Sequence, residues 1–279
     1  MFTSTDFRFN GLKASSFGLK LIRMDSSMFV EEPIAGNANL TEVDFVNDFR
    51  PYLYKVRRSP IEFNLQLALV DASDQPIEWT AAKKRTVYKW LLHNSYKELI
   101  FDDEPEAYFY AMAIGDIKLR SVYGEGYLEA NFRTNSPYAW SPPYEVSITG
   151  NATTDKTGNI FDLANKPTPA YDKIYLKVLM NRIAGTTKNP SFAVGTLATV
   201  NTITLDATKI TGIDTVLFNG ITKTIWSSDS LWTNKVPLYQ YRLLSRGDGF
   251  PYLARDHVNG YTLSAGWNAI IRYQYPILR

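Results

Sequence analysis

The sequence predicts a mainly β protein with two domains, and three observations support this prediction. Apolar and polar residues alternate along most of the 279-residue chain, which is the period of a β-strand. The charge balance changes along the chain: residues 1–144 hold 16 Lys and Arg against 19 Asp and Glu, whereas residues 145–279 hold 14 against 9. The segment NSPYAWSPP, residues 135–143, contains three prolines, which interrupt sheets. We therefore expect an N-terminal domain over residues 1–143 and a C-terminal domain over residues 144–279.

The first element is expected within ten residues of the N-terminus. Residues 7–24 read FRFNGLKASSFGLKLIRM, in which apolar residues flank the pair Asn10-Gly11. Asn-Gly between two apolar runs is the strongest short-range signal for a β-hairpin, because the turn needs residues that tolerate positive φ. The segment lacks the basic start and continuous apolar core of a secretion signal. We predict a strand, a turn and a second strand, in a protein that folds in the cytoplasm.

One helix is expected to interrupt the strands of the N-terminal domain. Residues 61–69 alternate between apolar and polar side chains and predict a half-buried strand. Residues 80–94 contain good helix formers, with Thr80 as the N-cap and apolar residues at helical spacing. Residues 97–140 return to alternation, broken by short turn signals, and predict three or four strands.

The C-terminal domain is expected to contain strands throughout. Its runs of β-branched and aromatic residues include KIYLKVLM, NTITLDA and GYTLSAGWNAIIRYQYPIL. Turn signals separate these runs at short intervals, and FNGI at residues 218–221 predicts a hairpin. Several short strands separated by turns in this way are typical of a β-sandwich or barrel.

The residue content argues against several classes of function. The chain has no cysteine and only two histidines, His93 and His257, so we predict no disulfide, no metal and no cofactor. No apolar run approaches the roughly 20 residues of a membrane-spanning helix, so no membrane insertion is expected. The formal net charge of +2 does not match the strong basic stripe of a nucleic-acid-binding domain.

The densest acidic cluster is DDEPE at residues 102–106. Glycoside hydrolysis uses two carboxylates, which makes a glycosidase one hypothesis. A catalytic pair must be held at a fixed separation on rigid elements, whereas these residues are neighbours in a predicted turn beside Pro105. A solvated turn is therefore the preferred interpretation, with ion binding as a further alternative. We predict that the protein is not an enzyme.

Two tryptophans of the C-terminal domain are candidates for glycan contact. Trp226 and Trp232 flank the polar segment SSDSL, and an exposed aromatic face can stack on a sugar ring. Core packing is the alternative for both, and it is the preferred interpretation for Trp267, which follows a glycine in an apolar strand.

Basic residues gather at the start of the predicted helix. Lys83, Lys84 and Arg85 lie in its first turn, where positive charge opposes the helix dipole. We treat them as candidates for an inter-subunit contact or for the lining of a channel. The alternative is a solvated surface.

The opening stretch resembles the N-terminus of siphophage distal tail proteins, the Dit family. That family begins with an aromatic-rich strand, an Asn-Gly turn and an S-x-x-[FY]-G-[LI] segment. The matching residues are Phe7, Phe9, Asn10, Gly11, Ser15 or Ser16, Phe17, Gly18 and Leu19. The segment GYLEANFRTNSPYAW is similar to the end of the family's first domain.

The C-terminal region is similar to another pattern of the family, fP.L..G.N.i. The residues that carry it are Phe250, Pro251, Leu253, Gly266, Asn268 and Ile270. One departure is that eleven residues separate Leu253 from Ala265, which is longer than the family's compact spacing. The loop between these positions is therefore expected to differ in shape.

The resemblance implies a structural role in a phage tail. It implies an N-terminal β-sandwich-like domain with one helix, which forms a hexameric ring, and a galectin-like β-sandwich (jelly-roll) as the C-terminal domain. Such a ring joins the tail tube protein to the tail-associated tip protein at the distal end of the virion's tail, around a channel through which DNA passes without specific binding. Receptor-binding or other baseplate proteins dock on the outer domain. No catalytic residue follows from the resemblance.

Three hypotheses are left for the function. The leading one is the tail hub, with ring-interface candidates Phe7, Phe9, Asn10, Gly11, Phe17 and Gly18. The second is a carbohydrate-binding module that contacts the host cell wall through the C-terminal domain. The third is the glycosidase.

Overall fold

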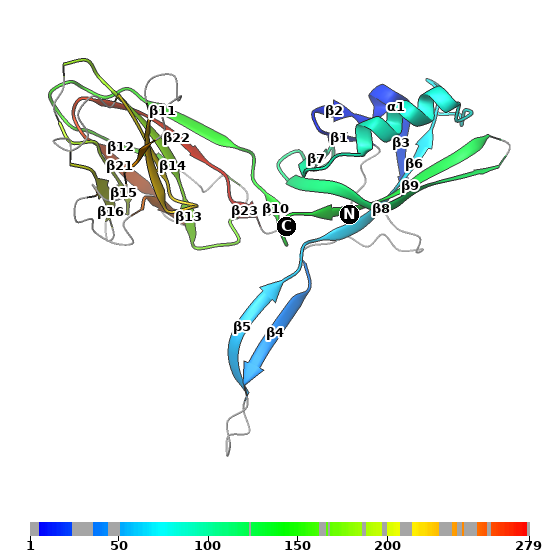
Figure 1. Cartoon of the computed structure of the whole chain (residues 1–279), viewed down its shortest axis with the longest axis horizontal. Coiled ribbons are helices and arrows are strands. Elements are labelled where there is room, and N and C mark those ends of the chain that lie inside the picture. The colour runs from blue at the N-terminus through cyan, green and yellow to red at the C-terminus, as the bar shows by residue number, and fades with distance from the viewer. Residues whose placement is uncertain are drawn as a thin grey trace. The chain divides into compact units, whose positions relative to one another are not determined.

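The computed structural model describes residues 6–23, 36–43, 51–122, 124–161, 166, 168–185, 188–196, 200–206, 214–228, 236–238, 242, 250–255 and 258–277. The chain divides into two compact units, whose elements are labelled in Figure 1. The N-terminal unit consists of Met1–Pro142 and Pro276–Arg279, and the C-terminal unit is Pro143–Tyr275. The described part of the chain is mainly β-strand, with one α-helix.

A nine-stranded antiparallel sheet forms the body of the N-terminal unit. Its main path runs β2-β1-β7-β8-β9-β6-β3, and β10 joins it by pairing with β8 and β23. The strands are β1 (Phe7–Phe9), β2 (Leu12–Lys13), β3 (Leu19–Arg23), β6 (Glu62–Leu69), β7 (Lys97–Phe101), β8 (Tyr108–Val122), β9 (Glu125–Thr134), β10 (Ala139–Trp140) and β23 (Pro276–Ile277). The predicted strand over residues 61–69 is confirmed as β6, whose Leu65, Leu67 and Leu69 are buried.

The predicted N-terminal hairpin is present. Phe9 pairs with Leu12, which leaves Asn10 and Gly11 as a two-residue loop. The φ angles of these two residues, 50° and 79°, are both left-handed, as a type I′ turn requires. A short 3-10 helix, η1 (Ala14–Phe17), follows the hairpin and leads into β3.

The predicted helix is α1 (Ala81–Leu91), and Thr80 is its N-cap. The Thr80 hydroxyl accepts a hydrogen bond of 3.3 Å from the backbone N–H of Lys83, which satisfies one of the free donors of the first turn. The helix ends before the predicted residue 94 because Leu92 has an extended backbone. Val87, Trp90 and Leu91 form its buried face.

A separate two-stranded sheet extends from the N-terminal unit (Figure 1). It consists of β4 (Ala38–Val43) and β5 (Tyr52–Arg58), and we call it the arm. Every residue of both strands is exposed.

The last strand of the chain belongs to the N-terminal unit. In β23, Ile277 pairs with Ala139 and Pro276 with Trp140 of β10. These residues were expected in the C-terminal domain over residues 144–279, because local sequence does not indicate which distant strand a short apolar run pairs with. Ile277 is buried at this position.

The C-terminal unit contains three antiparallel sheets. A six-stranded sheet has the order β11-β22-β14-β17-β18-β19, a four-stranded sheet has the order β12-β21-β15-β16, and β13 pairs with β20. The strands are β11 (Tyr144–Ile148), β12 (Lys156–Phe161), β13 (Lys173–Tyr175), β14 (Lys177–Arg182), β15 (Ser191–Gly195), β16 (Val200–Thr204), β17 (Thr215–Asn219), β18 (Thr224–Ser228), β19 (Val236–Pro237), β20 (Tyr252–Ala254), β21 (Asn259–Leu263) and β22 (Trp267–Tyr273).

One face of each large sheet provides the core of the C-terminal unit, as in a β-sandwich. The fully buried residues on these faces include Val178, Met180, Phe192, Val194, Ile203, Val216, Phe218, Leu263, Trp267 and Ile271. The predicted burial of Trp267 is confirmed, and its indole Nε1 donates to the backbone oxygen of Lys188 at 3.0 Å.

Candidate assembly and ligand-binding surfaces

The aromatic residues of the opening hairpin pack inside the N-terminal unit. Phe7 and Phe9 are 0% exposed. The ring of Trp90 on α1 stacks on Phe7 at 5.8 Å and on Phe17 at 4.6 Å between ring centroids. The expectation that Phe7 and Phe9 supply apolar contact to another subunit is therefore revised, because their side chains are enclosed by the unit's own core. Phe17 is only partly buried.

Gly18 occupies a position that requires a glycine. Its φ is 72°, and its N–H donates to Ser15 O at 2.9 Å to close η1. Its carbonyl accepts from Val70 N at 2.8 Å, and a Cβ added here would lie 3.2 Å from the Val70 oxygen. The residue therefore holds the end of η1 against the end of β6.

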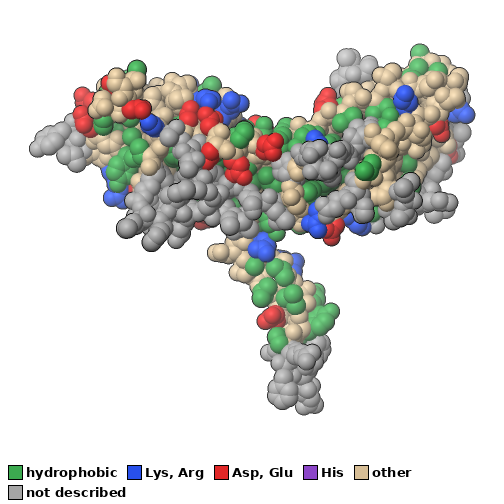
Figure 2. All heavy atoms as spheres, turned by 180° about the vertical axis from the view of Figure 1, so that it is seen from behind, with side chains coloured by type: hydrophobic (Ala, Val, Ile, Leu, Met, Phe, Trp, Pro, Cys, Tyr) green, Lys and Arg blue, Asp and Glu red, His purple; other side chains and the backbone are tan. Residues whose placement is uncertain are grey.

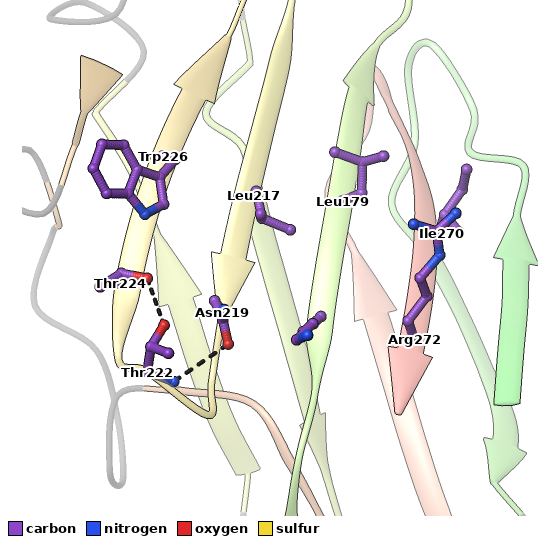
Figure 3. Close-up of a pocket in the computed structure, with 9 residues that line it drawn as sticks. Leu179, Leu217, Asn219, Thr222, Thr224, Trp226, Ile270 and Arg272 are labelled. Carbon is purple, nitrogen blue, oxygen red and sulfur yellow. Dashed lines mark hydrogen bonds between the residues drawn. The ribbon is translucent and has the colours of Figure 1, made fainter. Parts of the chain in front are cut away.

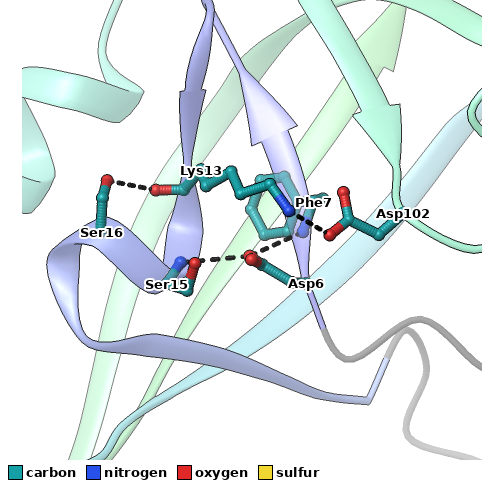
Figure 4. Close-up of polar contacts among 6 residues, drawn as sticks. All are labelled: Asp6, Phe7, Lys13, Ser15, Ser16 and Asp102. Atoms are coloured by element: carbon teal, nitrogen blue, oxygen red, sulfur yellow. Dashed lines mark hydrogen bonds and ion pairs between the residues drawn. The ribbon is translucent and has the colours of Figure 1, made fainter.

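Polar contacts fix the base of the hairpin (Figure 4). The carboxylate Oδ1 of Asp6 accepts hydrogen bonds from the N–H groups of Phe7 at 2.9 Å and Ser15 at 3.1 Å. Lys13 Nζ lies 2.6 Å from Asp102 Oδ2, which ties the hairpin to the acidic turn at residues 102–106. Both side chains of this ion pair are exposed, so it contributes little to stability.

The basic residues of α1 lie on its solvent side. Lys83 and Arg85 are exposed and Lys84 is half-buried. The first turn of the helix contains no acidic residue that would offset them. Their assignment to a channel or a subunit contact stays a proposal.

The arm carries several exposed apolar side chains. Leu40 pairs with Val56, and Val43 pairs with Tyr52 on the other side of the arm, because residues three apart in β4 point to opposite sides. Tyr54 is an additional residue of β5, where the register shifts between Thr41 and Glu42. These five side chains are between 45% and 72% exposed. Figure 2 shows hydrophobic side chains along this segment.

Polar pairs lie beside the apolar ones. Asn39 pairs with Arg57 and Thr41 with Lys55, on the side of the arm opposite Leu40. Every residue of both strands is exposed, so no part of the described structure buries the apolar side chains of the arm.

Backbone contacts anchor the base of the arm. Gly36 N donates to Pro137 O at 3.0 Å, and Ser59 N donates to Asn37 O at 2.9 Å. A Cβ on Gly36 would lie 1.6 Å from Ser59 O, so only glycine allows this approach of the two chains. Arg58 Nη1 adds a hydrogen bond of 3.3 Å to Gly36 O.

The outer face of the six-stranded sheet is hollowed into a groove of about 650 Å³ (Figure 3). The residues that line it are Lys177, Leu179, Leu217, Asn219, Thr222, Thr224, Trp226, Ile270 and Arg272. Trp226, a predicted glycan contact, lies on β18 and is half-buried in this groove. Trp232, the other predicted contact, lies outside the described residues.

The turn between β17 and β18 carries polar groups to the rim of the groove. Asn219 pairs with Thr224, so the predicted hairpin at FNGI is confirmed with a four-residue loop. Asn219 Oδ1 accepts from the N–H groups of Ile221 at 3.1 Å and Thr222 at 3.3 Å. The hydroxyls of Thr222 and Thr224 lie 2.7 Å apart. These contacts hold the amide and hydroxyl groups in fixed positions (Figure 3).

The family of the N-terminal region follows from a sequence comparison. Residues 2–136 match the family model of a phage tail protein N-terminal domain. This region is therefore similar to that family. The matched region contains the opening hairpin, the arm and α1. No curated protein sequence matches the chain at a significant level.

Solved structures share the fold of the whole chain. The Dit protein of phage SPP1, described as a paradigm of the hub adsorption apparatus in phages that infect Gram-positive bacteria, matches with a TM-score of 0.60 and 11% identity, over 97% of this chain and 98% of that one. Two activated phage P2 baseplate structures match with a TM-score of 0.51: the Ca form at 7% identity over 97% of both chains, and the Sr form at 8% over 96% of this chain and 97% of that one.

These likenesses confirm the predicted resemblance to distal tail proteins and the mainly β fold class. The chain has the fold of a distal tail protein over nearly its full length.

The remaining candidate positions form no assembled chemical site in the part of the chain that the structure describes. Within the described residues, no three His, Asp or Glu side chains are placed to hold a metal ion, and no helix is long and apolar enough to cross a membrane. His93 contacts Asn10 through Nε2 at 3.3 Å on the surface. His257 lies outside the described residues.

Proposed function

We propose that this tail protein is the hub of a siphophage or prophage tail tip. Six copies form a ring through their N-terminal units, and the ring joins the tail tube protein to the tail-associated tip protein. DNA passes through the central channel without specific binding. The C-terminal unit is available to receptor-binding or other baseplate proteins. The protein assembles in the bacterial host cytoplasm and is located at the distal end of the tail.

The arm is the observation that carries the proposal of a ring. A lone two-stranded hairpin is marginally stable in water, and exposed apolar side chains on a sheet form a surface for pairing with another chain. The exposed apolar side chains of the arm are covered, in this proposal, by a second copy of the chain. A closed ring needs two different patches on each subunit, and the arm supplies one of them.

The experiment compares two substitutions at neighbouring positions of β4. Leu40→Asp replaces an exposed apolar side chain opposite Val56 with a charge, whereas Thr41→Asp places the same charge opposite Lys55 on the other side of the arm. Both positions are exposed, so neither change disturbs the core of a unit. Negative-stain images and light scattering at matched concentrations report the oligomer.

We expect six-fold rings for the wild type and for Thr41→Asp, and monomers for Leu40→Asp with an unchanged unfolding midpoint. A wild-type protein that stays monomeric at high concentration, with the tip protein present, contradicts the ring. If Leu40→Asp still forms rings, the arm is not the contact between subunits, although the ring itself remains supported.

The opening hairpin has an indirect role in this proposal. Asn10, Gly11, Phe17 and Gly18 shape the surface loop, while the buried phenylalanines hold it to α1. Leu12 is the exposed apolar residue of the hairpin and is the position that we propose for direct contact with a neighbour.

We propose that the protein is not an enzyme. Asp102 is engaged by Lys13 on the surface, and the acidic residues lie in a turn directly after β7. We expect no cell-wall hydrolysis by the wild type, and therefore no change on the double substitution Asp103→Asn and Glu104→Gln. Hydrolysis by the wild type that disappears in this variant would support the glycosidase hypothesis instead.

The alternative main function is a carbohydrate-binding module that acts through the C-terminal unit. The family match lies in the N-terminal region, which favours the hub. Carbohydrate contact is compatible with the hub as an additional property of the C-terminal unit.

A further inference from the structure

Four strands of the C-terminal unit place one apolar residue each in a single row across the outer face of the sheet. Ile270 of β22 pairs with Leu179 of β14, Leu179 with Leu217 of β17, and Leu217 with Trp226 of β18. Adjacent strands lie about 4.8 Å apart, so the row extends for roughly 14 Å. All four side chains are half-buried and line the groove shown in Figure 3.

Polar side chains border the apolar row on both sides. The row displaced by two residues in one direction is Arg272, Lys177, Asn219 and Thr224, which are paired across the same four strands. The row in the other direction includes Asn268, Asn181 and Thr215. The apolar strip is therefore a single residue wide.

We propose that this groove binds an oligosaccharide. A sugar ring has an apolar C–H face and a rim of hydroxyl groups, which match an apolar strip with donors and acceptors along its edges. The indole of Trp226 provides the stacking surface at one end of the strip. Asn219 and Thr224 are already ordered by the turn contacts, so little conformational entropy is lost when they bind a hydroxyl group.

Two basic side chains, Arg272 and Lys177, lie at the other end of the groove. Arg272 Nε lies 2.6 Å from Glu145 Oε2, so part of its charge is balanced within the unit. Lys177 is exposed and makes no ion pair among the described residues. Its three donors suit hydroxyl or acidic oxygens of the sugar.

A protein partner fits this surface less well. The centre of a protein interface is a broad apolar patch with a polar rim, whereas here polar rows begin one residue from the apolar strip. The groove volume of about 650 Å³ also lies in the range of small-ligand sites.

The test uses the full-length protein with maltohexaose, cellohexaose and hexa-N-acetylchitohexaose as probes, screened on an array and then measured by calorimetry. We expect binding of at least one probe. Trp226→Ala should weaken it by about tenfold or more, and Lys177→Ala by about threefold. Tyr261→Ala is the matched control, because it removes a half-buried aromatic ring from a groove on the other large sheet and should leave the affinity unchanged.

Two results would overturn the proposal. One is that the wild type binds none of the probes with a dissociation constant below about 10 mM. The other is that binding persists unchanged in both Trp226→Ala and Lys177→Ala. If Trp226→Ala weakens capture of a baseplate protein while no probe binds, the groove is a protein-docking surface. Unfolding midpoints show whether each variant folds, and ring formation in the same samples tests the hub separately.

Discussion

The indole Nε1 of Trp90 donates a hydrogen bond of 3.0 Å to the backbone oxygen of Phe9, and the two rings meet edge to face at 5.9 Å. Trp90 lies in the last turn of α1, and Phe9 is the last residue of the first strand. This contact joins the only described α-helix to the opening hairpin. The first strand of the chain is therefore fixed by a residue about eighty positions later.

Replacing Trp90 with phenylalanine should destabilise the N-terminal unit by about 1–3 kcal/mol. Phenylalanine keeps an aromatic ring but lacks the indole donor, which leaves the buried oxygen of Phe9 without this hydrogen bond. Urea unfolding followed by circular dichroism measures the change. Lys89→Ala, an exposed position in the same helix, is the control and should differ from wild type by less than about 0.5 kcal/mol.

Gly18→Ala should destabilise the protein more than Gly11→Ala. Both residues have positive φ, so each alanine adds a backbone cost of about 1–2 kcal/mol. A Cβ at position 11 meets nothing within 4 Å, whereas a Cβ at position 18 lies 3.2 Å from the oxygen of Val70. The difference between the two unfolding free energies isolates that contact. Equal losses would show that the surrounding chain accommodates the methyl group without cost.

Thr80→Ala should destabilise α1 by about 0.5–2 kcal/mol, because it removes the hydroxyl that caps the first turn. Thr86→Ala makes the same chemical change inside the helix, where the Thr86 hydroxyl donates to Ala82 O. Alanine is the better helix former at an interior position, so this variant should be neutral or slightly more stable. Thermal unfolding of the pair separates capping from helix propensity.

The stability of the C-terminal unit should fall as the pH rises from about 10 to about 12. Burial raises the pKa of Tyr273 from 10.0 to about 12, and the neighbouring Tyr144 adds to the shift. In this pH range the unfolded chain releases the phenol proton while the folded chain keeps it, so ionisation favours unfolding. The unfolding midpoint of Tyr273→Phe should fall less between pH 9 and pH 11.5 than that of the wild type. An equal fall in both proteins would show that other groups cause the loss of stability.

The candidate sites were only partly predictable. Trp226 was found from its place beside a polar segment, and the structure puts it in a groove. Leu179, Leu217 and Ile270 read as ordinary strand residues, because nothing in a single strand indicates which residues on neighbouring strands share its register. The arm was missed because nothing within its two strands indicates that no other element covers their apolar side chains. Phe7 and Phe9 were taken for surface contacts, since their burial depends on Trp90.

The sequence by itself determined the class of the fold, the opening hairpin, the helix and its cap. These features depend on local chemistry: the period of apolar residues, the positive φ of Asn10 and Gly11, and a hydroxyl at Thr80. Only the tertiary structure decided the apolar row of the groove, the return of β23 to the N-terminal unit and the exposure of the arm. Each of these depends on strand pairing between residues far apart in the chain, and register and sheet order are set by packing that no local pattern encodes.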